Sequence, residues 1–213
     1  MPSHRFDLKE RVMKLIGMLD SPYVRRVAIS AKCLGVELEH DPVSVFRHFE
    51  RFQQINPVVK APTLILDDGE VLIDSTLILD YLEALSGKTL LPADLPQRAK
   101  ALRLIGLGLA ACEKAVQLYY ERNLRPADIQ YQPWVERVEG QLAAAFTALE
   151  HELEKHPLPT DGPFQQDGIT LAVAWSFTGL VVPDQIDAQR FPRIAQYTAY
   201  AESTQAFINT PMT

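Results

Sequence analysis

Short apolar runs alternate with helix-like patterns over the first 87 residues of the chain. Residues 12–18 form a compact apolar run that ends at a turn, which predicts a buried strand. Residues 22–34 carry apolar side chains at helical spacing and are followed by Gly35, a typical C-cap, so this segment is predicted as a helix. Residues 36–40 are predicted as a second strand and residues 42–52 as a second helix.

A hairpin and a third helix follow. Residues 63–66 and 71–73 are rich in strand-forming residues, and the Asp-Asp-Gly turn between them indicates two antiparallel strands. The next helix opens at Asp74 or Ser75 and ends at Gly87. The predicted order is therefore βαβαββα, in which a crossover helix joins the first two strands and helices cover the sheet.

Long helical patterns dominate the rest of the chain. Residues 88–96 contain two prolines and little periodicity, which is typical of a linker. The helices predicted beyond it cover residues 97–125, 131–155, 170–180 and 194–202. The pattern thus predicts an α/β domain followed by an all-helical domain. The predicted limits are 1–11 for an N-terminal extension, 12–87 for the first domain, 88–96 for the linker and 97–213 for the second domain.

Composition and charge exclude several classes of protein. The formal net charge of −6 over 213 residues argues against sequence-independent binding of nucleic acid. The sequence has no run of about 18 apolar residues, so we expect no membrane span. The charged N-terminus lacks the apolar core of a signal peptide. Cys33, Cys112 and the five histidines have neither disulfide nor metal-binding spacing, so we expect a cytoplasmic protein without a bound metal.

Ser21 stands before a proline at the start of the first predicted helix. A serine followed by proline at the first helical position is a common N-terminal cap. The same position also suits an anion, because a helix N-terminus presents unpaired N–H groups and a partial positive charge. The hydroxyl could therefore cap the helix or donate a hydrogen bond to a bound thiolate or phosphate.

Two further segments allow both a structural and a functional interpretation. Pro62 starts a predicted strand, where a trans bond is usual, but a cis bond would offer the backbone of Ala61 to a peptide-like ligand. Asp74 and Ser75 begin a helix, where both residue types are favoured as caps. They could also hold the ammonium and the carboxylate of an amino-acid head group.

Three segments stand in the order and spacing of the cytosolic glutathione transferases, which the chain resembles from residue 12 to about residue 209. These segments read SPYVRRVAI, NPVVKAPTL and DSTLILDYLE. The resemblance implies a thioredoxin-like domain with the order βαβαββα and then an all-helical domain, which agrees with the division drawn from periodicity. It also implies the serine-using, bacterial type of enzyme, glutathione as co-substrate, a twofold homodimer and no metal.

By this resemblance, Ser21 is the serine that activates the thiol of glutathione. Asp74 and Ser75 match the acidic residue and the serine that hold the γ-glutamyl group. The Ser21 hydroxyl and the positive end of the helix would lower the thiol pKa by stabilising the thiolate. The thiolate would then attack an electrophilic carbon bound in a mostly apolar cleft between the domains.

The resemblance implies further contacts with the rest of glutathione. Lys60 lies where the family has a lysine or glutamine that meets the glycyl carboxylate. Ala61 takes a place, usually valine, whose backbone pairs with the cysteinyl unit before a cis-proline, here Pro62. His48 is a second candidate for the glycyl carboxylate, although a solvated face of the second helix explains it equally well.

The second domain departs from the family pattern in one motif. The family usually has a Ser/Thr-x-x-Asp capping box, and here Thr170 is retained whereas Val173 replaces the aspartate. The predicted helix at 170–180 therefore lacks one reciprocal capping bond, worth about 1 kcal/mol. Tyr119 and Tyr120 could line a hydrophobic substrate site or pack at the surface.

The function expected from these residues is conjugation of glutathione to small electrophiles that are mostly apolar. One alternative is a glutathione-dependent thiol–disulfide oxidoreductase or peroxidase, against which the serine at position 21 weighs. Another is a non-catalytic protein that binds apolar ligands with the same fold. Neither nucleic acid nor a membrane is an expected partner, and the fold alone does not choose the electrophile.

Overall fold

The computed structural model describes residues 13–212, so the extension predicted for residues 1–11 lies outside the described part of the chain. The strands are β1 (Lys14–Ile16), β2 (Glu39–Asp41), β3 (Thr63–Ile65) and β4 (Val71–Ile73). The α-helices are α1 (Pro22–Leu34), α2 (Phe49–Ile55), α3 (Ser75–Ser86), α4 (Leu95–Asn123), α5 (Gln132–Lys155), α6 (Gln166–Val181), α7 (Pro192–Glu202) and α8 (Gln205–Ile208). Short 3₁₀ turns at η1 (Ala127–Ile129) and η2 (Pro183–Gln185) follow α4 and α6.

The strands form one mixed sheet in the order β2-β1-β3-β4. β1 pairs in parallel with β2 through the crossover helix α1, and it pairs antiparallel with β3, where Leu15 lies opposite Leu64. β3 and β4 form the predicted antiparallel hairpin. The first domain is thioredoxin-like, and the predicted order βαβαββα is confirmed.

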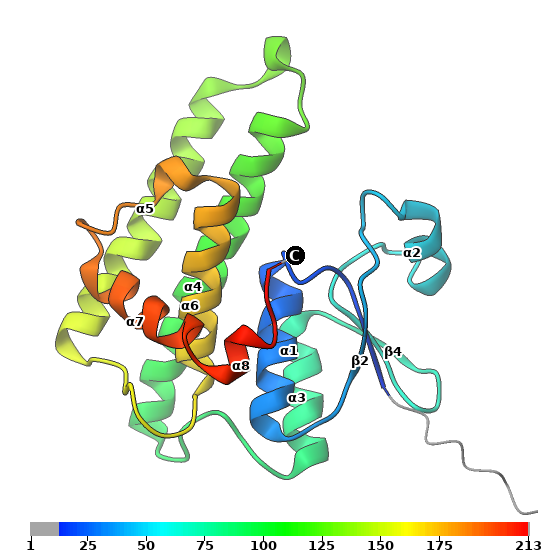
Figure 1. Ribbon diagram of the computed structural model, residues 1–213. Helices are drawn as coiled ribbons and strands as arrows, with labels where there is room; N and C mark the ends of the chain where they lie inside the picture. The colour runs from blue at the N-terminus through cyan, green and yellow to red at the C-terminus, as the bar shows by residue number, and fades with distance from the viewer. Residues whose placement is uncertain (1–12, 213) are drawn as a thin grey trace, which may run out of the picture.

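Successive residues of β1 face two different cores, because side chains alternate across a strand. Leu15 packs into the large core beneath α1 and α3. Ile16 joins a small cluster with Phe52 of α2 and with Val43, which lies between β2 and α2. In Figure 1, α1 and α3 lie between the sheet and the long helices, and α2 lies on the other side of the sheet. Helices therefore cover both faces, and α1 is placed between the two domains.

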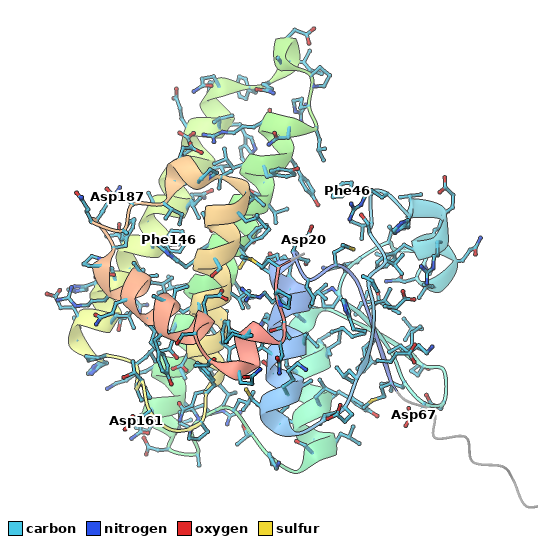
Figure 2. All side chains as sticks on the ribbon, in the orientation of Figure 1. Asp20, Phe46, Asp67, Phe146, Asp161 and Asp187 are labelled. Atoms are coloured by element: carbon cyan, nitrogen blue, oxygen red, sulfur yellow. The ribbon has the colours of Figure 1, made fainter. Side chains whose placement is uncertain are left out.

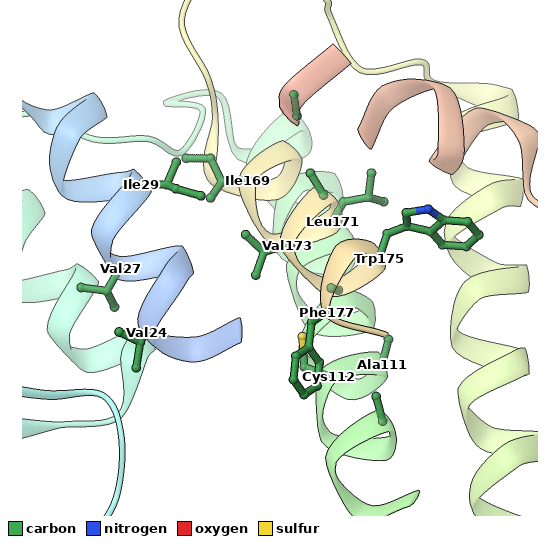
Figure 3. Packing of buried hydrophobic residues seen from close by; sticks show 14 of the residues in the cluster. Val24, Val27, Ile29, Ala111, Cys112, Ile169, Leu171, Val173, Trp175 and Phe177 are labelled. Atoms are coloured by element: carbon green, nitrogen blue, oxygen red, sulfur yellow. The ribbon is translucent and has the colours of Figure 1, made fainter. Parts of the chain in front are cut away.

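The helices of the second domain pack on one another and on α1. α4 contacts α5 and α6, and α6 contacts both α7 and α1. Figure 3 shows Ile29 of α1 beside Ile169 of α6, with Val173 and Phe177 farther along that helix. All four side chains are buried and belong to the same cluster, so the two domains share one continuous hydrophobic core.

The start of the second domain is marked by a capped helix. Asp94 is the N-cap of α4, and its carboxylate accepts from the amide of Gln97 at 3.0 Å. α4 thus begins within the predicted linker, and we keep 12–87 and 97–213 as proposed domain limits. Among the described residues, no helix combines the length and the apolar character that a membrane span would require.

The segment between β2 and α2 differs from the prediction. A helix over 42–52 is wrong for its first half, because α2 begins only at Phe49. The Ser44 hydroxyl accepts hydrogen bonds from two following amides, each at 3.2 Å, and these local bonds hold a turn in place of a helix. The preceding strand is also shifted, since it covers residues 39–41 rather than 36–40.

α6 begins four residues before the predicted start at residue 170. Thr170 therefore lies inside the helix, where its hydroxyl donates to the carbonyl of Gln166 at 2.7 Å, and the capping-box interpretation is wrong. Gly168 is required within this helix, because a Cβ added there would collide with the hydroxyl of Tyr197. The short helix α8 was not predicted.

Candidate functional site

A cavity of about 900 Å³ lies between the two domains, where the N-terminal ends of α1 and α3 face α4 and α6. Figure 2 labels two residues of its wall, Asp20 directly before α1 and Phe46 in the turn before α2. The first domain supplies most of the polar residues of the wall, α4 adds Glu113, and both domains supply apolar residues. The polar residues of the first domain are Asp20, Ser21, Ser44, Lys60, Asp74, Ser75 and Thr76.

Ser21 is the N-cap of α1 and lines the cavity. Its hydroxyl oxygen lies 3.5 Å from the amide nitrogen of Val24, a long distance for a capping hydrogen bond. The Ser21 amide donates to the carbonyl of Met18 at 3.1 Å, which holds the residue at the mouth of the helix. Because the hydroxyl acts as an acceptor in the capping contact, it can still donate its proton to an anion in the cavity.

Asp74 and Ser75 form a second helix N-terminus on the same wall. Asp74 is the N-cap of α3, and its carboxylate accepts from the amide of Thr76 at 2.9 Å. Its φ of 71° lies in the left-handed region, which is unfavourable for a residue with a Cβ. Strain of this kind is common where a side chain is held for a ligand. Asp74 thus caps the helix, and both residues line the cavity.

Arg26 lies behind this helix end and was missed in the sequence. It is 2% exposed, and Nη1 donates to the hydroxyls of Ser75 at 3.1 Å and Thr76 at 3.3 Å. Burial lowers its pKa to about 10, although the negative charge of Asp74 opposes the shift, so the guanidinium stays charged at neutral pH. Its buried Nε has no hydrogen-bond partner among the described residues. A fixed positive charge therefore stands beneath the polar wall.

Lys60, Ala61 and Pro62 form the next part of the wall. The peptide bond between Ala61 and Pro62 is cis. The carbonyl of Lys60 accepts from the hydroxyl of Thr63 at 2.7 Å, and Thr63 in turn accepts from the amide group of Asn56 at 2.9 Å. This buried network fixes the backbone before β3, while the Lys60 side chain remains exposed at the cavity.

The structure does not bring His48 to the cavity. Its Nδ1 lies 3.1 Å from the amide of Ser44, which donates to it, and the side chain is exposed beside the start of α2. His48 therefore helps to close the turn before α2. The remaining predicted residues, in contrast, all line one cavity. They are Ser21, Lys60, Ala61, Pro62, Asp74 and Ser75.

Apart from Glu113, the rest of the wall is apolar and rich in aromatic rings. The rings of Phe46 and Tyr120 meet edge to face with their centroids 5.7 Å apart. The ring centroids of Tyr119 and Tyr120 are 6.3 Å apart. Phe46 is 55% exposed and Tyr120 41% exposed, although both line the cavity. Large aromatic side chains left open to a cavity are typical of a binding surface for apolar ligands. Phe177 and Leu180 of α6 extend the same wall.

The cysteines are poorly placed for chemistry. Cys112 is buried in the core, and burial raises the pKa of its thiol to about 12. Burial also raises the pKa of Cys33, and neither residue lines the cavity. In the part of the chain that the structure describes, no group of three or more histidine, cysteine, aspartate or glutamate side chains could hold a metal ion.

The first domain matches a known family model. Residues 15–89 match the model of the glutathione S-transferase N-terminal domain. "Glutathione S-transferase U4" of Arabidopsis thaliana is 34% identical over 95 residues, or 44% of this chain and only 42% of the relative. "Uncharacterized GST-like protein YibF" of Escherichia coli K12 is 27% identical over 161 residues, which cover 75% of this chain and 76% of the relative.

Solved structures extend the similarity to the second domain. A glutathione S-transferase from Methylobacillus flagellatus KT with glutathione bound has a TM-score of 0.84 at 25% identity and covers 94% of this chain and 100% of its own. A glutathione transferase family member from Pseudomonas fluorescens Pf-5 with bound glutathione has a TM-score of 0.80 at 27% identity, over 94% and 99% of the two chains. The chain has the two-domain fold of these proteins, and the match to the glutathione S-transferase N-terminal model covers its first domain.

Proposed function

We propose that this chain is a glutathione transferase that activates the thiol of glutathione with Ser21 and conjugates it to small, mostly apolar electrophiles. The observation that carries the proposal is one cavity with two unlike walls. Ser21 and the two helix N-termini stand on a polar wall, and aromatic side chains from the turn before α2, from α4 and from α6 line the rest of the cavity. Such a cavity suits a polar co-substrate beside an apolar one.

The γ-glutamyl end of glutathione has both of its charges matched on the polar wall. The Asp74 carboxylate would pair with the ammonium group. The Ser75 hydroxyl and the N-terminus of α3 would hold the carboxylate, and the charge of Arg26, 3.1 Å from that hydroxyl, adds to the attraction. The strained backbone of Asp74 is then part of the binding site.

The rest of glutathione would run along the segment before β3. Ala61 offers backbone groups to the cysteinyl unit, and Lys60 offers an ammonium group to the glycyl carboxylate. The bonds from Thr63 and Asn56 keep this segment in place. We leave His48 out of the proposed site, because its Nδ1 is engaged by Ser44 away from the cavity.

The reaction proceeds by attack of the thiolate. Free glutathione is mostly a thiol at neutral pH, so its pKa must fall for rapid reaction. The Ser21 hydroxyl and the N-terminus of α1 lower it, and the thiol proton passes to water. The sulfur then bonds to the electrophilic carbon while the bond to the leaving group breaks and that group departs with the electron pair. Ser21 donates a hydrogen bond and forms no covalent bond.

We also propose that the chain forms a twofold homodimer through the apolar surface of α3 and the first half of α4. Leu77 and Leu85 on α3 are 64% and 52% exposed, and Leu95 and Leu102 on α4 are 75% and 49% exposed. Four leucines open to water on two successive helices are typical of an interaction surface. Twofold dimers are the commonest assembly of such chains.

The proposed function is tested by titrating glutathione into the protein and by measuring conjugation to 1-chloro-2,4-dinitrobenzene. Glutathione should bind and raise the melting temperature, because only the folded chain has the site. Asp74→Asn keeps a capping oxygen but loses the charge, so the dissociation constant should rise by about 10-fold or more. Asp94→Asn makes the same change at the N-cap of α4, outside the cavity, and should leave binding unchanged.

Three outcomes separate the competing functions. Absence of a calorimetric signal at millimolar glutathione would refute the site. Binding without conjugation would favour the non-catalytic binding protein. Reduction of a glutathione mixed disulfide without conjugation would favour the oxidoreductase, a result that we do not expect because a serine and no cysteine stands at the N-terminus of α1.

A further inference from the structure

Two carboxylates stand on the cavity wall outside the proposed glutathione contacts. Asp20 precedes Ser21 at the mouth of α1, where Figure 2 labels it, and Glu113 lies on α4. Among the described residues that line the cavity, Lys60 is the one lysine or arginine, and the proposed function assigns it to the glycyl carboxylate. An electrophile in the remaining space therefore meets negative charge from both domains and no lining cation.

Each carboxylate has a cation nearby, but neither of these cations lines the cavity. Glu113 pairs with Lys114, with 3.0 Å between Nζ and Oε1, and Arg47 acts electrostatically on Asp20. Each carboxylate thus lines the cavity and its counter-ion does not. A charged ligand therefore experiences the carboxylates first.

The influence of Glu113 extends to α1. Burial raises the pKa of Tyr23, and the negative charge of Glu113 raises it further, against the opposing charge of Arg26. Tyr23 lines the cavity two residues after Ser21, so the charge on α4 is sensed at the place where the thiol would lie. Asp20 shows the complementary effect, since burial raises the pKa of its carboxyl against the opposing charge of Arg47.

The aromatic rings of the same cavity favour a positively charged ligand over a negatively charged one. Phe46 and Tyr120 line the same space and are both more than one-third exposed. The faces of aromatic rings attract cations, whereas carboxylates repel anions. An aromatic wall that also carries carboxylates is therefore suited to a ring that is neutral or positively charged.

We propose that this cavity selects aromatic electrophiles that are neutral or carry a positive charge, and rejects those that carry an anionic group. The proposal rests on the proposed function, because the placement of glutathione on the polar wall defines which part of the cavity stays open. Asp20 and Glu113 are the residues that set this specificity.

Binding of unreactive rings tests the selection without any need for turnover. The probes are 3-nitrobenzoate, 3-nitrobenzamide and 3-nitrobenzyltrimethylammonium, titrated calorimetrically with millimolar glutathione present. We expect the cation to bind about 10-fold or more tightly than the anion, with the amide between them. Equal dissociation constants for the cation and the anion, or tighter binding of the anion, would overturn the proposal.

Substitution shows whether the two named residues are responsible. In the double variant Asp20→Asn, Glu113→Gln, the ratio of the two dissociation constants should fall by about 10-fold, toward one. Asp80→Asn removes the same kind of charge from an exposed position on α3 that does not line the cavity, and it should leave the ratio unchanged. A ratio that falls equally in Asp80→Asn, or persists in the double variant, would remove Asp20 and Glu113 from this role.

Turnover separates this proposal from the proposed function. The chlorinated counterpart 4-chloro-3-nitrobenzamide reacts by forming a carbon–sulfur bond as the carbon–chlorine bond breaks and chloride leaves with the electron pair. If the cation binds more tightly than the anion and the amide probe binds, but its chlorinated counterpart is not consumed, the transferase proposal fails and the charge selection stands. If the counterpart is consumed while the benzoate binds as well as the cation, the charge selection fails and the transferase proposal stands.

Discussion

The Ser21 hydroxyl can cap α1, donate a hydrogen bond to a bound thiolate, or do both. Removal of the hydroxyl distinguishes these roles, because one affects folding stability and the other affects the thiol pKa. If it donates to the thiolate, Ser21→Ala should raise the thiol pKa of bound glutathione and lower turnover at neutral pH by roughly 10- to 1,000-fold. The capping contact is long, at 3.5 Å, so the loss of folding stability should be no more than about 1 kcal/mol. Ultraviolet absorbance of the thiolate, followed against pH, measures the shift.

Ser21→Thr provides the matched control, because it keeps a hydroxyl at the same place. It should retain a lowered thiol pKa even if the added methyl group slows turnover. An unchanged titration curve and rate in Ser21→Ala would reduce Ser21 to a helix cap. The serine's type and position were evident from the sequence, because the serine-proline pair marks a helix start by itself.

Arg26 was not evident, and the reason is physical. Arg25 and Arg26 stand side by side in an apolar helix, and nothing local distinguishes them. The fold separates them, since Arg26 turns to Ser75 in the first domain and Arg25 turns to Glu202 in the second. Partners 49 and 177 residues away are set by tertiary packing, which local patterns do not encode.

At the scale of elements, one ion pair joins α1 to the end of the chain. The Arg25 guanidinium donates to both carboxylate oxygens of Glu202, each at 2.6 Å, and its Nε donates to the carbonyl of Thr210 at 2.8 Å. Burial raises the pKa of Glu202, but hydrogen bonds from Arg25 and Ser176 outweigh it and lower the pKa below 4.5. These bonds hold the end of α7 and the segment after α8 against α1, the helix that Ser21 caps.

Glu202→Gln should destabilise the fold at neutral pH by about 1–3 kcal/mol, because Arg25 is 2% exposed and loses its counter-charge. A lowered folded-state pKa contributes stability above the unfolded-state value of 4.5 that is lost as the pH falls through the folded value. The deficit of the variant should therefore shrink in acid. Denaturant unfolding of the parent protein and the variant, at neutral pH and at a pH below the folded-state pKa of Glu202, measures the deficit. A deficit that does not depend on pH would contradict the ion-pair account.

A surface pair gives the matched control. Glu154 lies 3.4 Å from Arg193, and both side chains are about half exposed. Glu154→Gln should change the free energy of unfolding by no more than about 0.5 kcal/mol at either pH.

Element boundaries could be predicted where local signals agree. Pro22–Leu34 has a serine-proline start, a helical apolar face and a glycine stop, and its predicted bounds are confirmed. The predicted starts of α2 and α6 were wrong: a side-chain turn at Ser44 takes the place of the first turns of one, and α6 begins four residues early, at Gln166, with Gly168 packed against Tyr197. Both effects depend on contacts that periodicity does not report.

For the whole molecule, the exposed leucines of α3 and α4 predict an assembly. Light scattering should give twice the mass of one chain. The double variant Leu77→Glu, Leu102→Glu should shift the protein toward the monomer, because charge would be buried in the interface. Leu124→Glu, at a residue that is 54% exposed beyond the far end of α4, should leave the mass unchanged. A monomeric parent protein would contradict the dimer.

The two-domain architecture could be predicted from the change in pattern near residue 88, but the full set of side chains that line the cavity could not. Six residues that the sequence predicted for the site line one cavity, and His48 does not. The aromatic wall arises because the turn before α2 meets α4, 74 residues farther along the chain at the Phe46–Tyr120 contact. The composition of the aromatic wall therefore depends on how the two domains pack against each other.

The core that passes from α1 into α6 also determines where the chain can be divided. Residues 15–89 match a domain model of their own, yet within this protein Ile29 is covered by Ile169 of the second domain. A fragment that ended at the linker would present that face of α1 to water and would lose the partner of Arg25. We therefore expect the two domains to unfold together, and a fragment that ends at the linker to hold the helix end that presents Ser21 less stably than the intact chain does.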